Sequence, residues 1–493
     1  MTEQTQPADL SVVIVGSGFA GLCMAIRLLQ SGVSDFLVLE RAGDVGGVWR
    51  DNTYPGIACD IESHLYSYSF APNPDWSRTF ASQREILEYL RACADTFGVR
   101  PKIRFNCGVV AATFDEPGGR WRVETSDGGT LTARVLVSGS GHALSKPILP
   151  DLPGLASFAG PAFHSARWDH SVDLAGKRVA VIGTGASAIQ IIPSIAPVVA
   201  SLLVMQRTAP WVMPRNERPI AEATRARFRR HPWLQKLLRG WLYLRHEVLA
   251  YGFVRRPAVL RLASRVVRRM IAARVKDPAL REKVTPRYTL GCKRVLLSDD
   301  YYAALGRDNV ELCTEAITDV RPAAVCTANG AVHPVDALVF ATGFEAAEGS
   351  LPFAIRGRRG EDLADAWRDG IAAYLGTAVA GFPNLFLLLG PNVGLGHSSM
   401  VYMIESQVAY ILDAILTLRA RDLRSVEVRR EVEARYNEEL QRRLARTVWQ
   451  TGGCTSWYQR RDGRNTTLWP GYTFEFRRRT RRFDAESYQL VGL

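Results

Sequence analysis

The stretch LSVVIVGSGFAG, residues 10–21, decides the fold of the N-terminal part of the chain. Its first six residues are largely apolar and β-branched, which predicts a buried parallel strand. A Gly-x-Gly-x-x-Gly loop follows, and residues 22–32 then repeat their apolar side chains at helical spacing. Gly16 permits the tight turn, Gly18 lets the backbone approach a pyrophosphate, and Gly21 lets the helix pack closely on the strand. The order of strand, loop and helix predicts a dinucleotide-binding unit.

The acidic end of the next strand indicates which dinucleotide this unit binds. FLVLE, residues 36–40, ends in Glu40, whose carboxylate can bond a ribose 2′-hydroxyl and repels a 2′-phosphate, so FAD or NAD is favoured over NADP. The loop that follows is rich in glycine and aromatic residues and is of the kind that wraps a cofactor. From the pattern alone, Asp60 in this loop is better explained as a turn or cap residue than as a catalytic one. The loop residues that we expect to bind the cofactor are Gly47, Trp49 and Tyr54.

A second glycine loop, GTGASA at residues 183–188, follows the strand 179–182. Gly183, Gly185 and Ala188 fill the three fingerprint positions, and alanine suffices at the third because the residue there only needs to be small. The following strand ends in Arg207-Thr208, where a cation accommodates a 2′-phosphate, so we expect this unit to bind NADPH. Two units with opposite charges at the ribose position imply two dinucleotides, FAD first and NADPH second. Ser187 completes the residues assigned to the second loop.

The order of these segments predicts an α/β protein with two Rossmann-like dinucleotide-binding domains and a helical insertion in the second. The prolines between residues 147 and 161 indicate a linker between the two domains. The predicted segments are 1–145 (first part of the FAD domain), 151–213 (first part of the NADPH domain), 214–287 (helical insertion), 288–343 (second part of the NADPH domain) and 344–493 (second part of the FAD domain and C-terminal segment).

Composition excludes several classes of protein. The chain has 493 residues, enough for two or three domains, and a net charge of +13, which favours anionic ligands or surfaces. The eight cysteines are scattered without a CxxC pair, so we expect neither a disulfide framework nor a metal site, and a reducing cytoplasm is the natural setting. The N-terminal residues do not have the pattern of a signal peptide, and no apolar run long enough to span a bilayer is apparent.

Between residues 225 and 276 nearly every charged residue is basic, and the pattern is helical. A solvated helical insertion with a basic face is the leading interpretation. Contact with a membrane surface is the second, because apolar residues of this segment could form one face flanked by arginines. Binding to nucleic acid is the weakest interpretation, because no recognised motif accompanies the charge.

The junction between the two units carries the most specific motif. The stretch FAGPAFHSARWD, residues 158–169, is similar to the signature F-x-G-x-x-x-H-x-x-x-W-[PD] of type I Baeyer–Villiger monooxygenases, and the resemblance extends over nearly the whole chain. We expect His164 to be architectural, linking domains that move relative to each other. The residues that fill the defined positions are Phe158, Gly160, His164, Trp168 and Asp169.

The resemblance also implies roles for residues outside the signature. Lys293-Arg294 resembles the Lys-Arg pair of the family's active site, which makes Arg294 catalytic and Lys293 a contact to the 2′-phosphate of NADPH. Asp60 resembles the carboxylate that orients this arginine. The C-terminal segment resembles that of 4-hydroxyacetophenone monooxygenases, which adds Trp457 and Asn465 as candidate contacts to NADP.

The implied activity is the insertion of one oxygen atom of O2 next to the carbonyl of a small-molecule ketone, through a flavin C4a-peroxide, to give an ester or lactone. FAD and NADPH are the implied cofactors. The sequence indicates neither which ketone is used nor the oligomeric state.

Three alternatives compete with this reading. Flavin-containing monooxygenases, which oxygenate sulfur or nitrogen, share the signature as far as the histidine, but the Trp168-Asp169 pair and Lys293-Arg294 argue against them. A pyridine-nucleotide disulfide reductase would need a redox-active CxxC pair. A non-catalytic protein that binds NADPH would purify without flavin.

Overall fold

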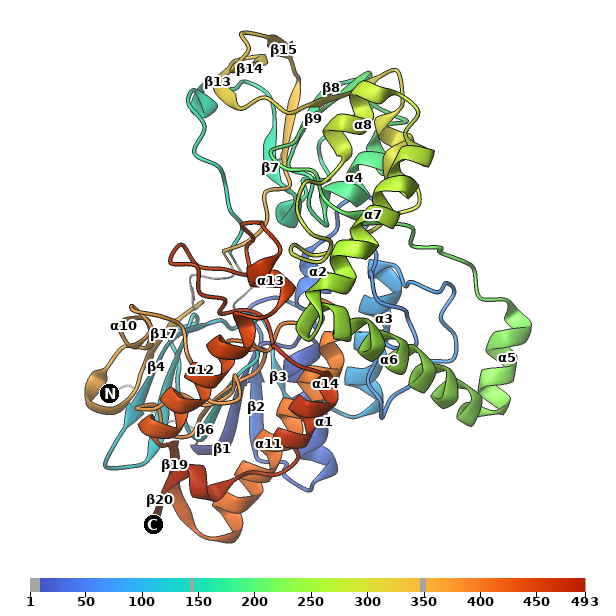
Figure 1. The fold of residues 1–493 in the computed structure, drawn as a ribbon. Helices are drawn as coiled ribbons and strands as arrows, with labels where there is room; N and C mark the ends of the chain where they lie inside the picture. Colours follow the sequence, from blue (N-terminus) through green and yellow to red (C-terminus); the bar gives the residue numbers. More distant parts are fainter. Residues whose placement is uncertain (1–8, 142–145, 346–351, 493) are drawn as a thin grey trace.

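The computed structural model describes residues 9–141, 146–345 and 352–492, so the N-terminal segment on which the signal-peptide expectation rested lies outside it. Two α/β units lie at opposite ends of the molecule, and a set of helices flanks them on one side (Figure 1). The two Rossmann-like domains with a helical insertion that the sequence predicts are confirmed.

The first unit is built on an eight-stranded sheet with the order β17-β4-β5-β6-β1-β2-β3, in which β18 also pairs with β6. Val15, the last residue of β1, lies opposite Leu39 and Ser138, so the carboxyl ends of three parallel strands meet where the first glycine loop begins. This edge is where open α/β sheets bind their ligands. The strands are β1 (Asp9–Val15), β2 (Phe36–Leu39), β3 (Ile103–Arg104), β4 (Val109–Asp115), β5 (Arg120–Thr125), β6 (Thr130–Ser138), β17 (Ala354–Arg356) and β18 (Leu385–Leu387).

Helix α11 is buried in this unit, where it packs against α1 and α14. By length and composition it is the one helix within the described ranges that could cross a membrane, and the sequence reading overlooked it. Two thirds of its apolar window is buried, so its place in the protein core accounts for its composition. The main helices of this unit are α1 (Phe19–Gln30), α3 (Gln83–Thr96), α11 (Met400–Ala420), α12 (Arg430–Leu444) and α14 (Thr473–Arg479).

The second unit has a five-stranded parallel sheet with the order β12-β9-β8-β16-β7. Because β8 lies next to β9 and β16, the second glycine loop also leaves its sheet among carboxyl ends of strands. The elements are β7 (Ala162–His164), β8 (Arg178–Ile182), β9 (Ser201–Met205), β12 (Val310–Cys313), β16 (Ala337–Phe340), α4 (Ala188–Ile195) and α9 (Tyr301–Leu305).

Four helices fill the predicted insertion and run along one side of both units (Figure 1). They are α5 (Glu222–Arg230), α6 (Pro232–Val254), α7 (Pro257–Arg274) and α8 (Pro278–Val284).

The chain crosses between the units twice, and the two crossings lie side by side. Ile148 N donates to Gly343 O at 2.9 Å, and Lys146 pairs with Glu345 at 2.9 Å. The paired crossings form a two-stranded connection between the units.

Several smaller elements accompany these main helices and strands. They are α2 (Val48–Asp51), α10 (Leu363–Ala366), α13 (Val448–Thr451), β10 (Val212–Met213), β11 (Leu296–Leu297), β13 (Ile317–Arg321), β14 (Ala324–Thr327), β15 (Val332–Pro334), β19 (Leu423–Val428) and β20 (Tyr488–Gly492).

Candidate active site

The first glycine loop packs tightly between β1 and α1. Gly16 has φ +93°, and its N–H donates to Leu39 O at 2.8 Å. A Cβ on Gly21 would lie 1.8 Å from Gly16 O, so only glycine allows the helix to approach the strand here. Gly18 caps α1 without a side-chain hydrogen bond, which leaves the N-terminal N–H groups of the helix for an anionic ligand.

Glu40 is buried, with 3% of its surface exposed, and it holds the loop in place. It accepts hydrogen bonds from Ser17 N at 2.9 Å and Ser17 Oγ at 2.7 Å, and it pairs with Arg50 at 3.1 Å. The contact from Glu40 to a ribose hydroxyl stays a prediction. The structure shows a second role for this carboxylate, which is to hold Ser17 and thereby the glycine loop.

The aromatic loop after Glu40 reaches from the first unit to the second. Gly47 lies against Gly18, with an added Cβ 3.1 Å from the Gly18 Cα atom. Trp49 donates its indole N–H to Tyr66 Oη at 3.1 Å. Tyr54 is buried and donates to Gln190 Oε1 of α4 at 3.3 Å, and burial raises the pKa of its phenol. The loop thus links the first glycine loop to α4, and the cofactor contacts predicted for it stay predictions.

The second glycine loop is more open than the first. Gly183 has φ +115° and donates to Met205 O at 3.0 Å, whereas a Cβ on Gly185 would meet no atom within 4 Å. Space above Gly185 is where a pyrophosphate would lie in a fingerprint of this type. Ser187 and Ala188 follow at the start of α4.

Two cations lie near the end of β9, where the 2′-phosphate site is predicted. Arg207 is exposed, and neither it nor Lys293 has a carboxylate partner in the described part of the chain. Burial lowers the pKa of Lys293, and the nearby charge of Arg207 lowers it further. Thr208 stays next to the loop because its carbonyl accepts from Thr184 Oγ1 at 3.3 Å. Two neighbouring unpaired cations are suited to a phosphate dianion.

Arg294 and Asp60 form an ion pair between the two units. Arg294 Nε and Nη2 lie 3.1 and 2.5 Å from the same oxygen of Asp60, although the residues are 234 positions apart. The carboxylate of Asp60 raises the pKa of Arg294. The Arg294 side chain keeps 44% of its surface exposed, so the cation is held in place and still open to a ligand.

The signature residues lie at the junction of the units. His164 ends β7 opposite Phe340, accepts a hydrogen bond from Ala166 N at its Nδ1 atom (3.0 Å), and packs edge-on against Phe344 of the second crossing. Burial lowers the pKa of His164, which favours the uncharged ring. A Cβ on Gly160 would lie 2.2 Å from Asp336 O. The other members have local roles: Phe158 packs on the core of the second unit, Trp168 packs on Phe163, and Asp169 accepts from Ser171.

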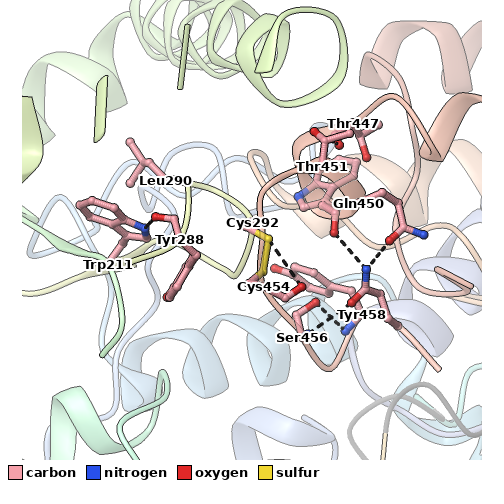
Figure 2. Close-up of a disulfide and its surroundings, with 12 residues drawn as sticks. Trp211, Tyr288, Leu290, Cys292, Thr447, Gln450, Thr451, Cys454, Ser456 and Tyr458 are labelled. Carbon is pink, nitrogen blue, oxygen red and sulfur yellow. Dashed lines mark hydrogen bonds between the residues drawn. A yellow bond between two sulfur atoms is a disulfide. The ribbon is translucent and has the colours of Figure 1, made fainter. Parts of the chain in front are cut away.

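A disulfide between Cys292 and Cys454 ties the Lys293–Arg294 segment to the C-terminal segment. Figure 2 shows it between the irregular segment that carries Tyr288 and Leu290 and the turn that carries Ser456 and Tyr458. The expectation that the cysteines form no disulfide is therefore wrong for this pair. The two cysteines are 162 residues apart, so no local spacing in the sequence indicates that they are bonded. The remaining six cysteines are free and buried.

The disulfide places part of the C-terminal segment beside Arg294. Tyr458 is buried near the guanidinium, and Trp457 remains exposed next to it. Asn465 is fully buried, and its Oδ1 atom accepts from the backbone N–H groups of Thr467 and Leu468. Asn465 supports a turn through its Oδ1 atom, while its Nδ2 atom is buried without a partner among the described residues, and the NADP contacts predicted for Asn465 and Trp457 stay predictions.

Comparisons with known proteins agree with this geometry. The profile of the family described as "Flavin-binding monooxygenase-like" matches residues 9–354. A protein named Baeyer–Villiger monooxygenase from Pseudomonas aeruginosa is 51% identical over 100% of this chain and 94% of its own length, and one from Streptomyces coelicolor is 50% identical over 100% and 95%. The chain belongs to the Baeyer–Villiger branch of the flavin-binding monooxygenase-like family.

Solved structures extend the family likeness to the whole fold. A steroid monooxygenase bound to NADP is similar with a TM-score of 0.87 at 35% identity, covering 99% of this chain and 100% of that one. A cyclohexanone monooxygenase from Rhodococcus sp. Phi1, bound to NADP+, has the same TM-score and coverage at 29% identity.

The residues of this family member fit a flavin dinucleotide in the first unit and a nicotinamide dinucleotide in the second. The uncapped N-terminus of α1 and the close glycines suit a pyrophosphate in the first unit, and the open Gly185 with Arg207 and Lys293 suits a phosphorylated ribose in the second. Several buried polar atoms have no partner among the described residues, namely both ring nitrogens of His397, Ser398 Oγ and Trp449 Nε1. Phe253 packs against both His397 and Trp449, so these atoms lie in one region.

Sequence reasoning missed a polar cluster next to Asp60. His246 on α6 lies 2.8 Å from Glu62 through Nε2 and 2.6 Å from His397 O through Nδ1. Burial lowers the pKa of His397 to about 3, so this ring is neutral. The available signal was weak: Glu62 follows Asp60 by two residues, and His397 lies in the glycine-rich turn before α11.

Proposed function

We propose that the protein is a cytoplasmic FAD- and NADPH-dependent monooxygenase that converts a ketone and O2 into an ester or lactone, with Arg294 as the catalytic residue. The observation that carries this proposal is the Arg294–Asp60 ion pair, in which the cation comes from the second unit and the carboxylate from the first. The pair is complete only when the two units face each other, so it couples the site for hydride delivery to the site for oxygen chemistry.

When bound, FAD supplies the activation of O2 that side chains cannot provide. The protein supplies positioning and charge. Arg294 cannot lose its proton, and its exposed face offers fixed N–H donors to negative charge that develops on the oxygen atoms of the reacting ketone. Asp60 accepts from Nε and Nη2 along one edge of the guanidinium and thereby fixes its orientation. Arg207 and Lys293 hold the 2′-phosphate that distinguishes NADPH from NADH.

The test is the Arg294→Ala variant assayed for FAD content, NADPH oxidation and ester yield. We expect FAD to remain bound and NADPH to be consumed, while ester formation falls by about 100- to 1000-fold. Arg287→Ala is the matched control, because Arg287 lies seven residues upstream with 90% of its side chain exposed. An ester yield close to that of the unaltered enzyme would sink the assignment of Arg294.

Oxygenation of sulfur or nitrogen, as in flavin-containing monooxygenases, is the competing activity. Incubation with matched aryl, cyclic, linear and steroid ketones and one thioether distinguishes the two. Sulfoxide without any ester or lactone from the ketone panel would favour the competing activity. The ketone with the highest yield defines the substrate class.

A further inference from the structure

The outward face of α6 and α7 carries a band of exposed apolar side chains. On α6 the spacing of four, four, three and four residues places them along one side of the helix. Each member of the band has 51–66% of its surface exposed, which is unusual for so many large apolar residues in a row. We call these residues the apolar band: Trp233, Leu237, Trp241, Leu244 and Val248 on α6, and Val259, Leu262 and Val266 on α7.

The inward side of α6 already packs on the protein through apolar residues such as Leu242 and Phe253 and through several polar groups. Gln235 donates to Asn73 O at 2.6 Å, and Arg239 donates to His64 O at 2.8 Å. Glu247 accepts from Thr473 N at 3.0 Å. These polar groups have hydrogen-bond partners within the protein. The inward side of α6 is therefore fixed on the monomer, and the apolar band lies on its outer side. The band therefore calls for a partner outside the monomer.

The exposed charged residues that α6 and α7 place around the band are all basic. Glu247 is the one acidic residue between positions 223 and 276, and it is buried. Arg255 pairs with Glu475 and Arg245 pairs with Glu62, whereas the remaining exposed cations next to the band have no acidic partner among the residues that the structure describes. The exposed cations are Lys236, Arg245, Arg255, Arg256, Arg261, Arg265 and Arg269.

We propose that the apolar band and its flanking cations dock on the surface of an anionic phospholipid bilayer. Helices that lie in the membrane interface have this pattern, with leucine, valine and tryptophan on one face and arginine and lysine at its edges. The apolar groups enter the boundary of the acyl chains, and the cations contact anionic headgroups. A second copy of the chain is a poorer occupant, because pairing two such faces would bring their cations together.

The position of the band relates docking to the active site. His246, on the inward side of α6, contacts Glu62 in the loop that carries Asp60. The bilayer would thus lie one helix away from the candidate active site, which is the arrangement expected of an enzyme whose substrates dissolve in lipid. Docking itself does not depend on the proposed activity.

The test is co-sedimentation of the full-length, FAD-loaded protein with vesicles of phosphatidylcholine alone or of phosphatidylcholine and phosphatidylglycerol in equal parts. We expect binding to the anionic vesicles, little binding to the neutral ones, and release at high salt. The triple variant Leu237→Gln, Leu244→Gln and Val248→Gln should bind the anionic vesicles at least about tenfold more weakly. It should retain FAD and its activity on a water-soluble ketone, because these side chains face outward.

Val198→Gln is the matched control, since Val198 is an exposed apolar residue outside the band and should leave vesicle binding unchanged. Two results would overturn the proposal. One is equal binding of the triple variant and the unaltered protein, or no binding by either. The other is a dimer in light scattering that the triple variant converts to a monomer without any vesicle binding, which would make a second copy the occupant.

Discussion

The two glycine loops follow the same strand–loop–helix plan, but they differ in the room they leave. The first loop is closed: Gly21 touches Gly16, Gly47 covers Gly18, and the acid at the end of the second strand is buried and already bonded. The second is open: no atom lies near the Cβ position of Gly185, and Arg207 is exposed and unpaired within the described ranges. A closed site suits a cofactor that remains bound, and an open one suits a cofactor that must bind and leave in each cycle.

Of the changes that test this difference between the loops, an alanine in the first loop should have the largest effect. Gly21→Ala places a methyl group 1.8 Å from a backbone oxygen, so we expect it to cost at least about 3 kcal/mol of the free energy of unfolding and to prevent FAD incorporation. Gly185→Ala is the matched change in the open loop, where the methyl group meets no atom, and it should keep full FAD content. Flavin absorbance per protein and thermal unfolding measure both. Equal FAD loss in the two variants would show that the loops do not differ as described.

The Cys292–Cys454 disulfide should stabilise the contact between the Lys293–Arg294 segment and the C-terminal segment. Cys454→Ser should lower the free energy of unfolding by about 2–4 kcal/mol, because the bond closes a loop of more than a hundred residues. Thiol titration of the denatured, unreduced protein should give six free thiols, the eight cysteines less the bonded pair. Eight free thiols would mean that the two cysteines are not bonded in the purified protein.

Arg207 tests whether the open loop selects for a 2′-phosphate. Arg207→Ala should lower kcat/KM for NADPH by about 10- to 100-fold, the value of a charge-assisted hydrogen bond, and leave kcat/KM for NADH unchanged. Steady-state oxidation of the two nucleotides provides the measurement, with NADH as the internal control. A parallel loss with both nucleotides would place Arg207 outside the phosphate site.

His164 should have the smallest effect, since it contacts neither glycine loop. His164→Ala removes the ring that packs on Phe344 and the acceptor for Ala166 N. We expect the ratio of ester formed to NADPH consumed to fall by less than roughly fivefold, about 1 kcal/mol, with FAD content unchanged. A loss of FAD in this variant would move His164 from the connection between the units to the flavin site.

Local patterns predicted both nucleotide units, because strand, glycine loop and helix are neighbours in sequence. The helical insertion followed from periodicity for the same reason. The pairing of Arg294 with Asp60 came from the family resemblance alone, since the two residues meet only through the packing of one unit on the other. The Cys292–Cys454 disulfide and the His246–Glu62 contact were missed because they depend on that packing and belong to no motif that the resemblance supplied.

The placement of β18 has a consequence for how the chain is made on the ribosome. Residues 136–138 of β6 pair with residues 385–387 of β18, on the side of β6 that β5 leaves free there. Translation at about 5–20 residues per second means that roughly 12–50 s pass between the synthesis of the two strands. Throughout this time the nascent protein carries an open sheet edge of the kind that promotes pairing with other chains. The second unit is synthesised during the wait, so the flavin site can be finished only after its partner unit has been made.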